Sequence, residues 1–177
     1  VNLASLYLGS GALTQSGDMA ITSTFSQTGG SFTATDPLND TFSAYDFSLV
    51  GGTFDRFTGS GTAIDPYLIR DIYDLQAMDG YLSSYFKLYD DMDALGTVNW
   101  NGGEGFNPIG NLANNFTGNF DGQNNIIDNL FINRPTEDYV GLFGYSSGAT
   151  IQNIGLTDTN ITGRNDVGSL VGFSRDS

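Results

Sequence analysis

The segment Ile127-Asp128-Asn129-Leu130-Phe131-Ile132 recurs as Ile151-Gln152-Asn153-Ile154-Gly155-Leu156, 24 residues further along the chain. Both copies follow the pattern Ile-x-Asn-aliphatic-x-aliphatic. Alternate side chains of a β-strand point to the same face, so the two aliphatic residues after each asparagine share a face. The asparagine suits the preceding bend, where it can bond to the backbone or to an equivalent asparagine one layer away. The repeat therefore predicts stacked strands, with Leu130 against Ile154 and Ile132 against Leu156.

Two further repeats have similar spacings. The Gly-Gly repeat consists of Thr28–Phe32 (TGGSF) and Val50–Phe54 (VGGTF), and the Gly-Leu repeat consists of Gly141–Gly144 (GLFG) and Ser169–Gly172 (SLVG). Gly-Gly pairs between short alternating runs indicate strand, turn, strand. Such periods are typical of a solenoid whose coils contain two or three short strands. We therefore predict an all-β solenoid; an antiparallel β-sandwich, which also has short strands and frequent turns, is the alternative.

The composition excludes several classes of partner. The chain has 20 acidic and 6 basic residues, a formal net charge of -14 and no cluster of basic residues. Nucleic acid and anionic lipid would be repelled, so neither is expected as a partner. No stretch approaches the ~20 apolar residues of a membrane-spanning helix, so membrane insertion is not expected.

The chain contains no cysteine and no histidine. This excludes disulfides, thiolate and imidazole metal sites, cysteine nucleophiles and every Ser-His triad. Lack of cysteine fits a protein exported from a bacterium or archaeon, so we expect an extracellular or cell-surface location. Because the sequence begins at Val1, any signal peptide is expected to have been removed or to lie outside this segment.

One short helix is predicted at residues 71–80. Asp71 is a suitable N-cap, and Gly80 is a suitable C-terminal residue. The apolar residues Ile72, Leu75 and Met78 have helical spacing. We expect this helix to cap or flank the coil, covering an apolar edge. The alternating residues 85–89 after it predict a strand.

From residue 59 onward the chain resembles the GLUG-motif segments of filamentous-haemagglutinin-like surface proteins. The resemblance is carried by an ordered series of short blocks. They are Gly59–Thr62, Asp65–Ile69, Phe86–Leu88, Asp91–Asp93, Asn107–Gly110, Phe116–Gly122 and Gly141–Gly144. It implies a right-handed parallel β-helix, export, and a role in adhesion or surface structure, with no catalytic residues. Residues 1–58 resemble haemagglutinin-type repeats, so we expect 1–58 and 59–177 to form one continuous solenoid.

Carboxylates are the remaining candidates for chemistry. Asp90, Asp91 and Asp93 offer oxygen ligands for a structural calcium ion, and calcium is the one cofactor we consider. Together with Asp121 they could also serve as the paired carboxylates of a polysaccharide-active β-helix enzyme. Because no Arg/Lys cluster accompanies them, solvated acidic surface is the preferred interpretation, and we predict no catalysis.

Aromatic residues concentrate between Tyr67 and Trp100. Exposed rings stack on sugar faces, so this stretch is the candidate glycan contact of a carbohydrate-binding module. Its candidate residues are Tyr73, Tyr81, Tyr85, Tyr89 and Trp100. Packing of these rings between the helix and the coil is the preferred alternative.

The two ends of the chain predict self-assembly. The segment Val1–Leu8 is apolar and strand-prone, and Gly168–Gly172 opens a coil that the sequence does not complete. Exposed solenoid ends are capped, continued or paired with another chain. We therefore predict a structural or adhesive surface protein or filament subunit that joins copies of itself or flanking repeats end to end. The candidate contact residues are Leu3, Leu6, Leu8, Leu170 and Val171.

Overall fold

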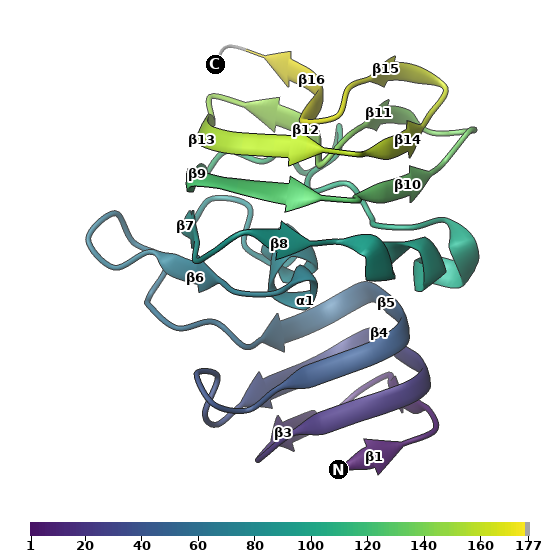
Figure 1. The fold of residues 1–177 in the computed structure, drawn as a ribbon. Coiled ribbons are helices and arrows are strands. Elements are labelled where there is room, and N and C mark those ends of the chain that lie inside the picture. The colour runs from purple at the N-terminus through teal and green to yellow at the C-terminus, as the bar shows by residue number, and fades with distance from the viewer. Residues whose placement is uncertain (176–177) are drawn as a thin grey trace.

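The structure is a computed structural model that describes residues 1–175, and it consists mainly of β-strands with a few short helices. The strands form layers that follow one another from the N-terminal end to the C-terminal end (Figure 1). Every pair of named strands in this range is parallel. The all-β prediction is confirmed, and the parallel pairing contradicts the antiparallel sandwich alternative.

The first stack is a five-stranded sheet in which a long strand pairs with three short strands on one side and a second long strand on the other. These strands are β1 (Asn2–Leu3), β2 (Leu6–Leu8), β3 (Ala12–Gln15), β4 (Met19–Ala34) and β5 (Phe42–Asp55). Phe25 pairs with Phe47 and Phe32 with Phe54 across β4 and β5, so the spacing of the Gly-Gly repeat is confirmed as a structural register. Each Gly-Gly pair lies within one continuous strand, however, and not in a turn between two strands as predicted.

Each long strand bends at its Gly-Gly pair. Gly30 and Gly52 have φ of 72° and 84°, in the left-handed region that glycine adopts without steric cost. The two bends also stack closely, because a Cβ at Gly52 would overlap the backbone of Gly29 and Gly30. Only glycine can therefore occupy the second bend without displacing the first.

Replacing Gly52 by alanine should lower the free energy of unfolding by about 2 kcal/mol or more, since a left-handed alanine costs roughly 1–2 kcal/mol before any clash. Gly17 has a similar φ of 89°, but a Cβ there would meet nothing within 4 Å. Gly17→Ala is thus a control that carries the backbone cost alone. Urea denaturation of both variants measures the difference, and equal losses would contradict the close stacking of the bends.

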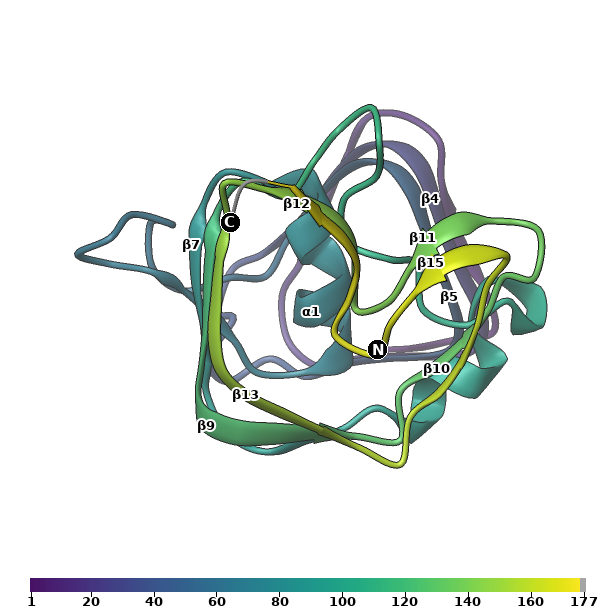
Figure 2. The ribbon, with the colours of Figure 1, turned by 90° about the horizontal axis from the view of Figure 1, so that it is seen from above.

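The second stack contains another five-stranded sheet and three two-stranded sheets. The five-stranded sheet consists of β6 (Tyr67–Ile69), β7 (Tyr85–Leu88), β8 (Met92–Asp93), β9 (Asn119–Asp128) and β13 (Thr150–Thr157). The two-stranded sheets are β10 (Phe131–Asn133) with β14 (Asn160–Thr162), β11 (Asp138–Val140) with β15 (Asn165–Val167), and β12 (Phe143–Ser147) with β16 (Val171–Arg175). The layer from β13 to β16 therefore lies strand by strand on the layer from β9 to β12. Figure 2 shows these two layers superimposed when viewed from above.

The predicted register of the Ile-x-Asn repeat is wrong. Leu156 pairs with Ile127, and Ile154 pairs with Asn125, so Ile154 does not lie over Leu130. Ile132 pairs with Ile161, in the two-stranded sheet of β10 and β14, and therefore not with Leu156. The turn of the chain is longer than the 24-residue sequence repeat throughout: Gln152 pairs with a residue 31 positions earlier, and Leu156 with one 29 positions earlier. The Gly-Leu repeat is confirmed, because Phe143 pairs with Val171.

A short helix lies between the two stacks (Figure 1), and in the view from above it lies within the outline formed by the strands (Figure 2). Helix α1 (Ile72–Ala77) begins at Asp71, whose carboxylate accepts hydrogen bonds from the backbone N–H groups of Tyr73 and Asp74. The 3-10 helix η1 (Met78–Gly80) continues it. The Tyr73 hydroxyl bonds to the backbone of Ala44 in β5, the strand at which the first sheet ends. The helix predicted at residues 71–80 is therefore present as α1 and η1 together, and it covers this sheet edge.

A second 3-10 segment, η2 (Leu95–Gly103), also packs against β5, and the sequence analysis did not predict it. Between β5 and these helices the core is rich in aromatic rings. Trp100 is fully buried, with its ring centroid 5.0 Å from that of Phe47 and 5.2 Å from that of Tyr73. The continuous core thus connects the two stacks, and within residues 1–175 no strand of one stack pairs with a strand of the other.

Candidate functional site

The three acidic candidates for calcium lie on the exposed surface near β8, where they accept hydrogen bonds from the protein itself. Asp91 Oδ1 accepts from the Ile126 N–H at 2.8 Å, and Asp90 Oδ1 accepts from the Asp91 N–H at 2.9 Å. Asp93 Oδ1 accepts from the Leu95 N–H at 2.9 Å. Among residues 1–175, no group of three or more acidic side chains is placed to hold a metal ion. The three carboxylates thus cap backbone N–H groups of the protein. Calcium binding stays a prediction.

Asp121, the fourth carboxylate considered, lies in β9 beneath the polar end of β13. Burial raises the pKa of Asp121, but hydrogen bonds from Gln123, Asn153 and Gln152 outweigh it, and the pKa is lowered. The Asn153 amide donates to Asp121 Oδ1 at 3.0 Å. Asp121 therefore stays ionised and connects two adjacent layers, which is a structural use of a carboxylate.

The five aromatic candidates do not form one exposed row. Tyr73 and Trp100 are buried in the core, so the glycan contact predicted for them is wrong and the packing alternative holds. Tyr81 is partly buried and packs edge-on against Tyr67, with ring centroids 5.5 Å apart. The other two candidates, Tyr85 and Tyr89, are exposed.

The candidate assembly residues lie in the first and the last strand layers of the molecule. Leu3, Leu6 and Leu8 belong to the first layer, and Leu170 and Val171 belong to the last. All of them are half-buried and pack against the hydrophobic core. A hollow of about 450 Å³ at the C-terminal end is lined by apolar residues that include Ala149, Ile151, Leu170 and Val171. Apolar surface is thus accessible at the last layer.

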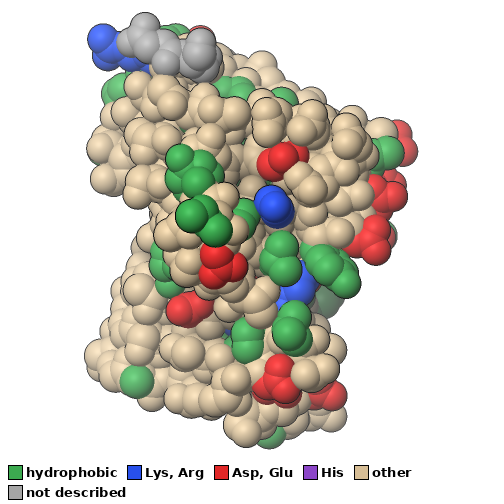
Figure 3. Space-filling view, turned by 90° about the vertical axis from the view of Figure 1, so that its left-hand side faces the viewer, with side chains coloured by type: hydrophobic (Ala, Val, Ile, Leu, Met, Phe, Trp, Pro, Cys, Tyr) green, Lys and Arg blue, Asp and Glu red, His purple; other side chains and the backbone are tan. Residues whose placement is uncertain are grey.

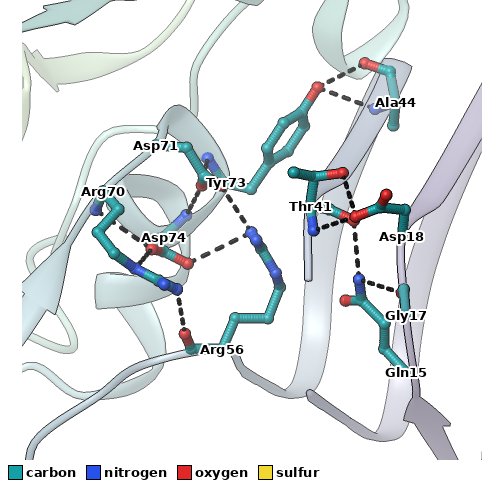
Figure 4. Close-up of polar contacts among 10 residues, drawn as sticks. All are labelled: Gln15, Gly17, Asp18, Thr41, Ala44, Arg56, Arg70, Asp71, Tyr73 and Asp74. Carbon is teal, nitrogen blue, oxygen red and sulfur yellow. Dashed lines mark hydrogen bonds and ion pairs between the residues drawn. The ribbon is translucent and has the colours of Figure 1, made fainter. Parts of the chain in front are cut away.

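A buried ionic cluster occupies the joint between β5 and α1 (Figure 4). Arg56, only 2% exposed, lies 2.9 Å from Asp71 and 3.4 Å from Asp74, while the Arg70 N–H donates to Asp74 Oδ2 at 3.2 Å. Arg70 Nη2 also donates to the Arg56 carbonyl oxygen at 2.9 Å. Burial raises the pKa of Asp74 to about 7, and Asp71 adds to this, whereas Arg56 and Arg70 lower it. The sequence analysis missed this cluster, although the i,i+4 pair Arg70 and Asp74 was a usable signal.

The surface outside these candidate sites is mainly polar, and its charged side chains are scattered. Figure 3 shows scattered acidic and basic side chains among a mostly uncharged surface on one side of the molecule. Arg164, which directly precedes β15, makes two hydrogen bonds with Asp138 of the neighbouring strand β11, at 2.8 and 2.6 Å. Hydrogen bonds from Arg164 and Asn165 lower the pKa of Asp138 to about 2.

Two adjoining hollows form what we call the side groove. The first, of about 580 Å³, extends from Tyr7 in β2 past β4 and β5 to the loop around Asn101. The second, of about 490 Å³, lies beside residues 80–84, and both are lined by Asp79 and Asn111. The groove could not be predicted from the sequence, because the residues that line it are far apart in the chain, from Tyr7 in β2 to Arg134.

Comparison with known proteins gives two similar sequences. Over 125 residues, 67% of the chain, it is 40% identical to halomucin of Haloquadratum walsbyi, but it spans only 1% of that protein. Over 107 residues, 59% of the chain, it is 37% identical to a protein of Evansella cellulosilytica whose name reads Gly-rich membrane protein, and spans 12% of it. No family model and no solved structure matches the chain. Within residues 1–175, no helix has the length and apolar character needed to cross a bilayer.

Proposed function

We propose that this chain is a structural or adhesive segment of a surface or extracellular protein, built as a right-handed parallel β-helix of the GLUG type and without catalytic activity. The observation that carries the proposal is the parallel stacking of β13 to β16 on β9 to β12. A fold in which each layer repeats the strand order of the layer below gives a rigid rod whose length grows with the number of repeats.

The similarity to halomucin supports the proposed location at the cell surface or outside the cell. The chain spans only a small part of that protein, so we propose that this segment is one portion of a longer coil. The acidic, cysteine-free composition is compatible with such a location. The absence of histidine and cysteine supports the non-catalytic part of the proposal.

End-to-end contact is the proposed mode of assembly, with copies of this chain or flanking repeats as the partners. Within residues 1–175, the strands of the last layer pair only with the layer below them. Their outward N–H and C=O groups can continue a parallel ladder, and the apolar hollow beside Leu170 can continue the core. Head-to-tail contacts of this kind produce filaments.

Replacing Leu170 by arginine should abolish this assembly, because a charge would enter the apolar end surface without a partner. We expect the unaltered chain to form species whose mass rises with concentration, and the variant to stay at 18.9 kDa in analytical ultracentrifugation. Leu95→Arg, at an exposed site in the middle of the molecule, is the matched control and should assemble normally. Electron microscopy should show rods for the unaltered chain. An unaltered chain that sediments as a monomer at every concentration would contradict end-to-end assembly.

A further inference from the structure

The side groove has the dimensions of a binding site. Each of its two hollows falls within the ~300–1,000 Å³ typical of pockets for small ligands. Because they share Asp79 and Asn111, the hollows adjoin, and an extended ligand can occupy both. The groove crosses layers of the coil, so its length follows the stacking direction.

One wall of the groove presents a ring and a row of hydroxyl groups. Tyr7 is 72% exposed, and it pairs in register with Ser26, which pairs with Ser48 in the next layer. Adjacent parallel strands are ~4.8 Å apart, so the two serines present hydroxyl groups at that interval. An exposed ring with neighbouring hydroxyl groups suits the alternating apolar faces and hydroxyl edges of a sugar chain.

Carboxylates and amides also line the groove, and one of them, Asp46 of β5, lies on the same strand as Ser48. The carboxylate of Asp79 accepts a hydrogen bond from the Gly110 N–H at 2.8 Å, and it lies where the two hollows meet. Asp46 and Glu104 add further acceptors to the first hollow, and Asn107 adds an amide that both donates and accepts. Carboxylates and amides of this kind form hydrogen bonds with neutral hydroxyl groups.

The charge of the groove selects among hydroxyl-rich ligands. Arg134, the cation that lines it, is only 8% exposed and is paired with Glu104 at 3.5 Å and Glu137 at 2.9 Å. Its charge is therefore already compensated, while Asp46 and Asp79 leave the groove acidic. An anionic polysaccharide would meet like charge, and a neutral one would not.

We infer that the side groove binds a neutral, hydroxyl-rich glycan, with Tyr7 as the stacking ring and with Asp46 and Asp79 as hydrogen-bond acceptors. The ligand class goes beyond the structural role proposed above and does not depend on end-to-end assembly. It also places the sugar contact on a different surface from Tyr85 and Tyr89, the exposed rings of the stretch between Tyr67 and Trp100.

Affinity gel electrophoresis of the whole chain against soluble β-glucan, mannan and galactan tests the inference, with polygalacturonate as the acidic comparison. We expect retardation by at least one neutral polysaccharide and none by polygalacturonate. Tyr7→Ala should weaken binding by about tenfold, the equivalent of losing one stacked ring. Tyr45→Ala, at a 61% exposed ring that does not line the groove, should leave binding unchanged. Circular dichroism of both variants verifies that they are folded.

A second variant tests the junction of the two hollows. Asp79→Asn keeps an oxygen that can accept from the Gly110 N–H but removes the charge, so it should weaken glycan binding while the fold persists. Tyr89→Ala, at a 66% exposed ring outside the groove, should have no effect. The inference is overturned if no neutral polysaccharide binds, if only polygalacturonate binds, or if Tyr89→Ala weakens binding while Tyr7→Ala does not. None of these results would affect the assembly test.

Discussion

Replacing Phe25 by alanine should lower the free energy of unfolding by about 3–5 kcal/mol, the usual cost of removing a fully buried aromatic ring. Phe25 is completely buried in β4 and is stacked on Phe47 of β5, with ring centroids 5.1 Å apart. Its ring also meets Phe32, Phe42 and Phe54 edge-on, at 5.8, 5.4 and 5.5 Å. The cavity left by alanine would therefore be lined by rings that cannot close over it without losing their own contacts.

Urea denaturation followed by tryptophan fluorescence measures this loss. Trp100 is the single tryptophan and packs against Phe47, so its emission reports directly on the core that Phe25 supports. Tyr45→Ala in the adjacent strand removes an exposed ring and should change stability by less than about 0.5 kcal/mol. A loss below about 1 kcal/mol for Phe25→Ala, well short of the usual cost of such a truncation, would show that the first stack is not held by this aromatic core.

The register of the first stack could be predicted because its repeat contains large side chains at the paired positions. Phe25 pairs with Phe47 and Phe32 with Phe54, and the glycine pairs bend at matching places. The phenylalanines of one strand stack on those of the next strand, so the sequence repeat and the structural repeat have the same length. Helix α1 was also predictable, since its N-cap and apolar spacing are local signals.

The register of the second stack could not be predicted from its most similar segments. Asn129 and Asn153 both have left-handed backbones, with φ of 58° and 54°, so the shared Ile-x-Asn pattern identifies a bend. The bends do not lie over one another, because Asp128 pairs with Thr157 and Asn129 is therefore followed one layer up by Asp158, with φ of 46°. Sequence similarity had detected a common local conformation, whereas the register depends on the length of the whole turn.

The side groove, and the part of the ionic cluster that goes beyond the i,i+4 pair Arg70 and Asp74, could not be predicted from the sequence for a different reason. Tyr7 and Ser48 come together because β4 pairs with the strands of both residues, and Arg56 reaches Asp74 across the joint from β5 to α1. For Tyr73 and Trp100 the sequence left two interpretations, glycan contact and the preferred core packing, because aromatic composition does not distinguish a ring that stacks on sugar from one that fills a core.

The ionic cluster gives stability a pH dependence that Asp74→Asn should remove. Burial raises the pKa of Asp74 to about 7, whereas an unfolded aspartate has a pKa of about 3.9. The folded state therefore holds this proton more tightly than the unfolded state. The resulting stabilisation is fully present below about pH 3.9 and is lost as the pH rises through about 7.

Between pH 4 and pH 8, the unaltered chain should consequently lose stability relative to Asp74→Asn. The difference in unfolding free energy should change by a few kcal/mol, since each pKa unit corresponds to about 1.4 kcal/mol. Arg56, Arg70 and Asp71, the charged groups around Asp74, remain in both proteins, so comparing the two isolates the contribution of one carboxylate. Urea denaturation at each pH gives the two profiles.

Asp138 provides a control of opposite sign. Hydrogen bonds from Arg164 and Asn165 lower its pKa to about 2, so its stabilising effect is present above about pH 3.9 and is lost as the pH falls through 2. Asp138→Asn should therefore alter the profile only in acid, where Asp74→Asn has no further effect. If the profiles of Asp74→Asn and the unaltered chain stay parallel from pH 4 to pH 8, Asp74 is ionised throughout. The attraction of Arg56 and Arg70 would then exceed the cost of burying its charge.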